Sequence, residues 1–189
     1  KNERFFTPEE KGNRNAYELV QQVSNLNKGH YLEEETLNES TTNFCIGVAG
    51  YPEKHCEAAN MDLDLHYLKQ KVDAGAGYIT TQMFFDNKKY FDFVDKCREV
   101  GITVPIIPGL KPITTLSQLQ VLPSIFNIDI PGELTRSLLQ CRSKEDVGIV
   151  GKEWLVMQCR ELMQAKGPFL HFYTMGKNLV VRDVLKTIL

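Results

Sequence analysis

Apolar residues follow two alternating patterns along this chain. Short continuous apolar runs are typical of strands buried on both faces of a parallel sheet. We place such strands at residues 44–50, 78–85, 104–110 and 168–174. Between and after these runs, apolar residues recur every three or four positions, as in amphipathic helices. The predicted helices cover residues 60–75, 88–100, 115–122, 131–141, 144–165 and 179–189.

The first part of the chain has a different character. A polar arm leads into a helix whose apolar residues run from Ala16 to Leu26, and Gly29 follows its last turn as a helix-ending glycine should. Residues 31–43 are acidic and rich in turn formers. We therefore expect two regions, an arm, helix and acidic loop at residues 1–43 and a β/α region at residues 44–189.

The alternation of strand and helix predicts an α/β fold with a parallel sheet and right-handed crossovers. Two architectures fit, an open doubly wound sheet and a β/α barrel. No glycine fingerprint for a dinucleotide follows any strand, and Gly75-Ala76-Gly77 follows a helix, where it reads as a C-cap. Polar residues gather after the strand ends, which suits the upper rim of a barrel.

Composition narrows the classes of function. The 189 residues carry 22 Lys and Arg against 24 Asp and Glu, a net charge of −2, which argues against nucleic acid as a partner. The apolar runs are far shorter than the roughly 20 residues that span a membrane. Five cysteines without a C-x-x-C pair fit no zinc pattern and favour a reducing, cytoplasmic location. We expect no metal, nucleic-acid or membrane partner.

The loop after the first strand contains an aromatic, a carboxylate, a lysine and a histidine within five residues, Tyr51-Pro-Glu-Lys-His55. Enzymes of both candidate architectures build their sites at this end of a strand. A solvated turn around Pro52 explains the same residues equally well.

One face of the next helix carries Asn60, Asp64, Tyr67 and Lys71, spaced at i, i+4, i+7 and i+11. This face could hold a phosphorylated cofactor, with Lys71 supplying the charge. Without further information, the polar side of an amphipathic helix is the favoured interpretation.

Gln82 interrupts an otherwise apolar strand. An unpaired buried amide costs roughly 1–3 kcal/mol, so Gln82 must bond a neighbouring strand or face a ligand, and we favour the ligand. We expect His171, in the last strand, to be a satisfied core residue. No Ser–His–Asp order, Cys–His pair or carboxylate dyad emerges. The residues alone predict a site for an anionic cofactor or small molecule on one rim.

Six sequence blocks carry a resemblance that goes further. They are residues 48–55, 68–76, 79–86, 106–113, 126–131 and 170–175. Together they closely resemble the methylenetetrahydrofolate reductase family over residues 44–189, and residues 12–28 resemble the helix that precedes them. The resemblance implies a TIM (β/α)8 barrel that binds FAD and passes hydride from NAD(P)H to methylenetetrahydrofolate. The product, methyltetrahydrofolate, serves one-carbon metabolism and methionine supply.

The resemblance also implies contacts with the cofactor. Tyr51 and His55 would contact FAD at the flavin. Asp64 and Lys71 would contact its ribityl–ribose and diphosphate portion, and Ala16 would pack on it from the first helix.

For the folate substrate, the resemblance implies Gln82 as a hydrogen-bonding residue, Gln118 as a second substrate-site glutamine and Lys177 as a nearby basic residue. Leu122 stands where some family members place a phenylalanine over the substrate, so no stacking contact is expected there.

The family's folate-protonating acid and its Arg-Gly-Asp segment precede all the blocks seen here, so no catalytic residue is assigned. A full barrel needs eight strands and about 250 residues, whereas the pattern predicts four strands. We therefore expect the carboxyl-terminal half of a reductase, with little or no turnover by itself. Its two open strand edges should pair with another copy, as a homo-oligomer, or with the missing half. The alternative is a non-catalytic flavin- or folate-binding half-domain, or a subunit that completes another chain's barrel.

Overall fold

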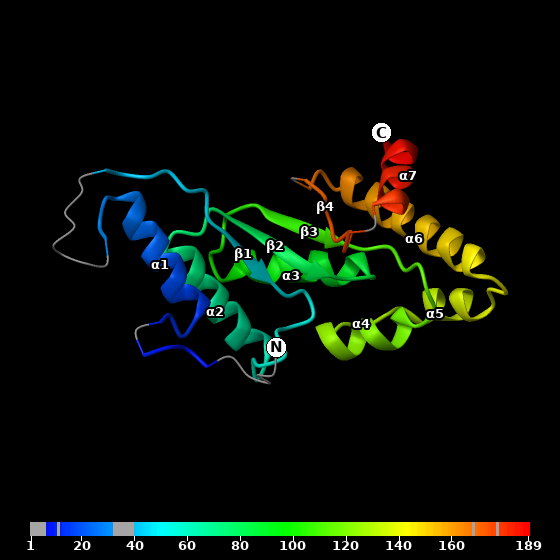
Figure 1. The fold of residues 1–189 in the computed structure, drawn as a ribbon, viewed down its shortest axis with the longest axis horizontal. Helices are drawn as coiled ribbons and strands as arrows, with labels where there is room; N and C mark the ends of the chain where they lie inside the picture. Colours follow the sequence, from blue (N-terminus) through cyan, green and yellow to red (C-terminus); the bar gives the residue numbers. More distant parts are fainter. Residues whose placement is uncertain (1–6, 11, 32–39, 168, 177) are drawn as a thin grey trace.

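The computed structural model describes residues 7–10, 12–31, 40–167, 169–176 and 178–189 (Figure 1). The strands are β1 (Gly47–Gly50), β2 (Tyr78–Met83), β3 (Ile106–Leu110) and β4 (His171–Phe172). The helices are α1 (Ala16–Asn27), α2 (Met61–Asp73), α3 (Asn87–Glu99), α4 (Gln118–Phe126), α5 (Gly132–Leu139), α6 (Lys144–Gln164) and α7 (Leu179–Ile188). No helix in these ranges is both long and apolar enough to cross a membrane.

The four strands form one parallel sheet whose spatial order, β1-β2-β3-β4, is the order along the chain. The predicted parallel β/α units are therefore confirmed. A doubly wound sheet reverses its strand order at a switch point, and the described strands contain no such reversal. Consecutive parallel neighbours are the arrangement of β/α-barrel units, which favours the second of the two architectures.

The main core lies between one face of the sheet and the helices that cover it. Ile79 of β2 and Ile106 of β3 point into this core, where they meet Leu65 of α2, Phe93 of α3 and Leu155 of α6. In Figure 1, α3 lies behind the sheet, on this covered face. Each of these side chains is almost completely buried, so removal of apolar surface from water holds the helices against the sheet.

A second core lies beyond the carboxyl ends of β2 and β3. Phe85 and Ile113, which follow these strands, pack with Leu122 of α4, Leu134 of α5 and Val147 of α6. This core holds α4 and α5 at the end of the sheet where the sequence predicts the functional site.

The other face of the sheet carries side chains that are exposed or half-buried, among them Ala49 and Gln82. Tyr173 crosses this face and donates its hydroxyl to the carbonyl oxygen of Thr81 at 2.9 Å. Its ring passes over Gly109, where a Cβ atom would stand 2.7 Å from the ring and 2.2 Å from the Thr81 oxygen. Glycine at this position therefore permits the crossing.

Several element boundaries differ from the prediction, and β2 and β3 are each two residues shorter than expected. β1 begins at Gly47 instead of residue 44, because the side chain of Asn27 holds the backbone of Phe44, accepting from its N–H at 2.8 Å and donating to its carbonyl oxygen at 3.0 Å. β4 has only two residues. The division into residues 1–43 and 44–189 remains a prediction.

The fourth helix also differs. It begins at Gln118, three residues later than predicted, and continues through Pro123 to Phe126, beyond the predicted end at residue 122. The loop before it is held by Gln118, whose side-chain oxygen accepts the backbone N–H groups of Thr114 and Thr115 at 2.6 and 3.1 Å. Those N–H groups are therefore satisfied outside the helix.

Candidate functional site

The loop after β1 brings two aromatic side chains together at the carboxyl end of the strand. The rings of Tyr51 and His55 meet edge-on, with centroids 4.6 Å apart and planes at 75°. Nδ1 of His55 accepts the backbone N–H of Glu57 at 3.2 Å. In the neutral imidazole the proton then resides on Nε2, which can donate to a ligand.

Asp64, in the first turns of α2, fixes this loop. Asn60 caps the helix by accepting the backbone N–H of Leu63 at 2.9 Å. The Asp64 carboxylate is 8% exposed and its Oδ2 accepts the backbone N–H of His55 at 2.8 Å. A carboxylate near a helix N-terminus is favoured by the helix dipole, so Asp64 is stabilised while it holds the loop.

Lys71 lies two turns further along α2 and reaches back to the sheet. Its Nζ donates to the carbonyl oxygen of Ala49 in β1 at 2.9 Å. Burial lowers the pKa of Lys71, and the negative charge of Asp64 opposes that shift. The result is a partly desolvated cation beside the end of β1, an arrangement that attracts an anionic ligand.

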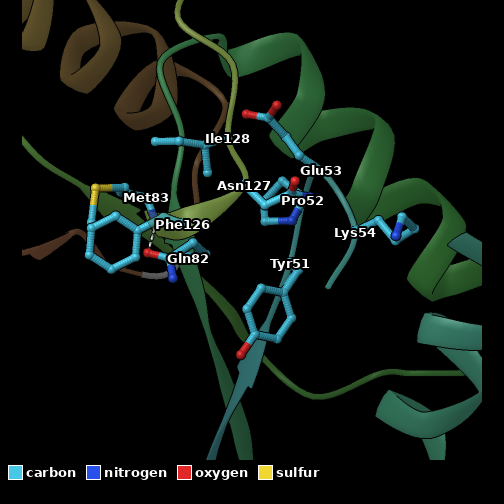
Figure 2. Close-up of a pocket in the computed structure, with 9 residues that line it drawn as sticks. All are labelled: Tyr51, Pro52, Glu53, Lys54, Gln82, Met83, Phe126, Asn127 and Ile128. Carbon is cyan, nitrogen blue, oxygen red and sulfur yellow. Dashed lines mark hydrogen bonds between the residues drawn. The ribbon is translucent and has the colours of Figure 1, made fainter. Parts of the chain in front are cut away.

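Gln82 projects from the end of β2. Figure 2 shows it beside Tyr51, with which it lines a narrow crevice. Gln82 Oε1 accepts the backbone N–H of Met83 at 3.0 Å, and its Nε2 has no hydrogen-bond partner among the described residues. The amide thus bonds its own neighbour instead of another strand, and because it is half-buried its N–H groups remain available.

The hydroxyl of Tyr51 is a neutral donor in this crevice. Burial raises its pKa, and the charge of Asp64 raises it further. Both effects disfavour the phenolate, so Tyr51 keeps its proton at neutral pH.

Glu53 anchors the same loop from the other side. In Figure 2 its carboxylate points away from the ring of Tyr51. Its Oε2 accepts Nζ of Lys89 at 2.6 Å and the backbone N–H of Asp129 at 2.8 Å, and Lys89 also bonds Oδ2 of Asp129 at 2.6 Å. Burial raises the pKa of Glu53, while Lys89 and the Asp129 N–H oppose the shift. Sequence reasoning grouped Glu53 with the candidate loop but missed this anchoring role.

The remaining predicted residues are less closely connected. Gln118 commits its side-chain oxygen to the loop before α4, as described above. Ala16 is exposed at the start of α1, which packs against α2. Lys177 lies outside the described residues. Tyr51, His55, Asp64, Lys71 and Gln82 are therefore the predicted residues that the structure gathers at the carboxyl ends of β1 and β2. Their roles toward ligands remain predictions.

The expectation for His171 is wrong. Its side chain is exposed and meets the ring of Tyr173 edge-on, with centroids 4.7 Å apart. His171 lies on the sheet face opposite the main core, which the sequence pattern of a buried strand does not reveal.

Comparison with known proteins links this arrangement to one family. A family model described as methylenetetrahydrofolate reductase matches residues 1–189. A probable methylenetetrahydrofolate reductase (NADPH) of Caenorhabditis elegans is 38% identical over 147 residues, which are 77% of this chain and 22% of that protein. Methylenetetrahydrofolate reductase 1 of Schizosaccharomyces pombe is 35% identical over 183 residues, or 96% of this chain and 28% of that protein.

A bacterial relative is shorter. The 5,10-methylenetetrahydrofolate reductase of Pectobacterium carotovorum is 34% identical over 143 residues, covering 75% of this chain and 48% of that protein. The chain thus spans about a quarter of the length of the two eukaryotic relatives and about half that of the bacterial one.

Proposed function

The chain belongs to the methylenetetrahydrofolate reductase family, and on that premise we propose that it takes part in the FAD-dependent reduction of methylenetetrahydrofolate by NAD(P)H. The observation that carries the proposal is the gathering of Tyr51, His55, Asp64, Lys71 and Gln82 at the carboxyl ends of two adjacent parallel strands. Sites of β/α-barrel enzymes are built at this end.

The side chains present fit FAD. A flavin ring is bound by aromatic surface and neutral hydrogen-bond donors, and the Tyr51–His55 pair offers both. A diphosphate is bound by a cation, which the partly desolvated amine of Lys71 offers. FAD, when bound, supplies the redox centre that accepts hydride from NAD(P)H and gives it to the folate.

In this proposal, the chain's own residues bind FAD and orient it. Lys71 holds the diphosphate, and the Tyr51 hydroxyl and His55 Nε2–H donate to the flavin. Asp64 contacts the ribityl–ribose portion with an oxygen while its Oδ2 keeps the His55 backbone in place. Ala16 packs on the cofactor from α1.

The folate is bound from the crevice side. The free N–H groups of Gln82 are matched to carbonyl-type acceptors on the folate's pterin ring, and Gln118 can donate through its own amide nitrogen. Lys177, which lies outside the described residues, is proposed as a basic residue near the folate. The acid that protonates the folate is not assigned to a residue of this chain.

A second set of β/α units is proposed to complete the sheet, supplied by the other half of a barrel or by a second copy of this chain. The supporting observation is that β1 and β4, within the described sheet, each have one unpaired edge. The same observation favours the second candidate function, a non-catalytic flavin- or folate-binding half-domain or partner subunit. In either case we propose a cytoplasmic location.

Cofactor binding is tested by titrating the purified protein with FAD and following the flavin fluorescence. Lys71→Met should weaken binding by about tenfold to a hundredfold, because a hydrogen bond to a charged group contributes about 1.5–3 kcal/mol. The matched control is Lys69→Met on the same helix, where Lys69 pairs with Asp73 at the surface. Equal affinities of the two variants would contradict the role of Lys71.

Turnover separates the two candidates. NADH or NADPH oxidation that requires both FAD and methylenetetrahydrofolate supports the reductase function. Saturable FAD binding without such oxidation, even when the chain is combined with the other half of the barrel, supports the half-domain. Absence of both FAD binding and oxidation would exclude the two proposals.

A further inference from the structure

A cavity of about 410 Å³ lies on the outer side of the fold, among α3, α5 and α6. Its volume falls within the range of about 300–1,000 Å³ that is usual for small-molecule sites. None of the residues proposed to bind FAD or folate lines it. The cavity therefore requires an explanation separate from the reductase function.

Three carboxylates face this cavity, Asp86 at the start of α3, Glu133 in the first turn of α5 and Glu161 on α6. No lysine or arginine of the described chain lines it. Asp86 accepts the backbone N–H of Lys88 at 2.9 Å, and Glu161 accepts Nδ2 of Asn87 at 2.7 Å. Within the described ranges, none of the three carboxylates forms an ion pair, so the cavity lacks a cation.

An independent observation comes from Gln158, which also lines the cavity and is 5% exposed. Its Nε2 donates to the carbonyl oxygen of Phe84 at 3.3 Å and to Oδ1 of Asn87 at 3.2 Å. Exchanging the amide oxygen and nitrogen would place the oxygen against these two acceptors, so the orientation is fixed. Its Oε1 is buried and finds no donor among the described residues.

An orphaned buried acceptor costs about 1–3 kcal/mol, which a donor from a ligand would offset. A positively charged group would pair with the carboxylates, and an N–H group would donate a hydrogen bond to the oxygen of Gln158. A cationic ligand with several N–H donors on one rigid group could make both interactions at once.

Trp154 adds a flat aromatic surface to the cavity wall. Its Nε1 donates to the carbonyl oxygen of Phe85 at 2.9 Å, which fixes the orientation of the ring in the cavity wall. The ring is partly buried against the second core. A guanidinium group is planar, always charged, carries five N–H donors and stacks on indole rings. From the carboxylates, the unpartnered Gln158 oxygen and this indole, we propose that the cavity binds a guanidinium group of the arginine type.

Trp154 makes the proposal directly measurable, because it is the only tryptophan in the chain. Titration with Nα-acetyl-arginine amide should give a saturable change in tryptophan fluorescence. The neutral isostere Nα-acetyl-citrulline amide should give none. Absence of saturation up to about 10 mM arginine amide, or an equal response to the citrulline compound, would overturn the proposal.

Variants identify the groups that bind. Glu133→Gln removes a carboxylate that makes no hydrogen bond among the described residues, and it should weaken arginine amide binding roughly tenfold. The matched control is Glu153→Gln, which makes the same change at an exposed position next to Trp154 but outside the cavity wall. Weaker arginine amide binding by Glu133→Gln than by Glu153→Gln supports the site, and equal affinities of the two variants overturn it.

Gln158→Leu removes the orphaned acceptor and should also weaken binding several-fold, with circular dichroism confirming that the variant is folded. If it is unfolded, the Glu133→Gln comparison decides the question alone.

The guanidinium could come from a free small molecule or from an arginine side chain of a polypeptide. A glycine–serine peptide with one central arginine, compared with its citrulline counterpart, distinguishes these sources. Tenfold tighter binding of the arginine peptide than of the arginine amide assigns the cavity to a polypeptide. Equal binding of the two assigns it to a small-molecule guanidinium.

Discussion

Gly151 of α6 lies so close to the carbonyl oxygen of Ile113 that a Cβ atom at Gly151 would stand 1.8 Å from that oxygen. The oxygen belongs to the backbone of a segment that is itself buried, so it cannot move aside as a flexible side chain could. This approach sets the separation between α6 and the chain that follows β3. The position of Trp154, one turn further along α6, is set by the same separation.

Gly151→Ala should therefore destabilise the fold by about 3 kcal/mol or more, since overpacking a tight interior forces backbone shifts. Gly148→Ala is the matched control on the same helix, because a Cβ atom there meets nothing within 4 Å. It should stabilise the protein by about 0.5–1 kcal/mol through helix propensity. Urea unfolding measures both, and changes of the same sign would contradict the close approach.

Tyr90 ties α3 to the sheet, because its hydroxyl donates to the carbonyl oxygen of Ile106 at 2.7 Å in a buried setting. Burial raises the pKa of Tyr90 to about 12, so the donor keeps its proton under ordinary conditions. Tyr90→Phe leaves the Ile106 oxygen unpaired and should lower the free energy of unfolding by about 1–3 kcal/mol. Tyr67→Phe, at an exposed position of α2, should change it little. A similar loss in both variants would contradict the role of the bond.

The boundaries of several elements could be predicted because their signals are local. The side chain of Asn60 caps the N-terminus of α2 by accepting the backbone N–H of Leu63. At the other end, the backbone N–H of Gly75 donates to the carbonyl oxygen of Val72. Phe44 shows the limit of such signals. Its apolar run predicts a strand. In the structure, however, the side chain of Asn27, 17 residues earlier, forms hydrogen bonds with the backbone N–H and carbonyl oxygen of Phe44, and the strand begins only at Gly47.

Part of the candidate site could also be predicted, because some of its signals are local in the sequence. The loop from Tyr51 to His55 was located from its position after a strand. The anchoring of Glu53 by Lys89 joins residues 36 positions apart, and no local pattern reports such a pair. The exposure of His171 depends on which sheet face lacks a helical cover, and that is a property of the whole fold.

Lys89 and Lys88 provide a test of the Glu53 anchor at adjacent positions. Lys89 pairs with Glu53, whose side chain is 9% exposed, whereas Lys88 pairs with Asp92 at the surface. Lys89→Met leaves the Glu53 carboxylate without its cation and should cost about 2 kcal/mol of unfolding free energy. Lys88→Met should cost much less, because exposed ion pairs contribute little. Equal losses in urea unfolding would show that the anchor does not stabilise the fold.

The pH dependence of stability tests the environment of Glu53. Burial raises its pKa above the ordinary value of 4.5, against the opposing effects of Lys89 and the backbone N–H of Asp129. The folded state then binds the Glu53 proton more tightly than the unfolded state. This contribution to stability is fully present below pH 4.5 and is lost as the pH rises through the folded pKa. The stability of the native protein relative to Glu53→Gln should therefore fall as the pH rises across this window.

The neighbouring carboxylate supplies a control of opposite sign. Lys89 lowers the pKa of Asp129 below its ordinary value of 3.8. The contribution of Asp129 is present above pH 3.8 and is lost as the pH falls through the folded pKa, so stability relative to Asp129→Asn should rise with pH in that range. Urea unfolding of the three proteins at a series of pH values measures both slopes. A pH-independent difference between the native protein and Glu53→Gln would mean that Lys89 and the Asp129 N–H fully offset the effect of burial, which would contradict a raised pKa for Glu53.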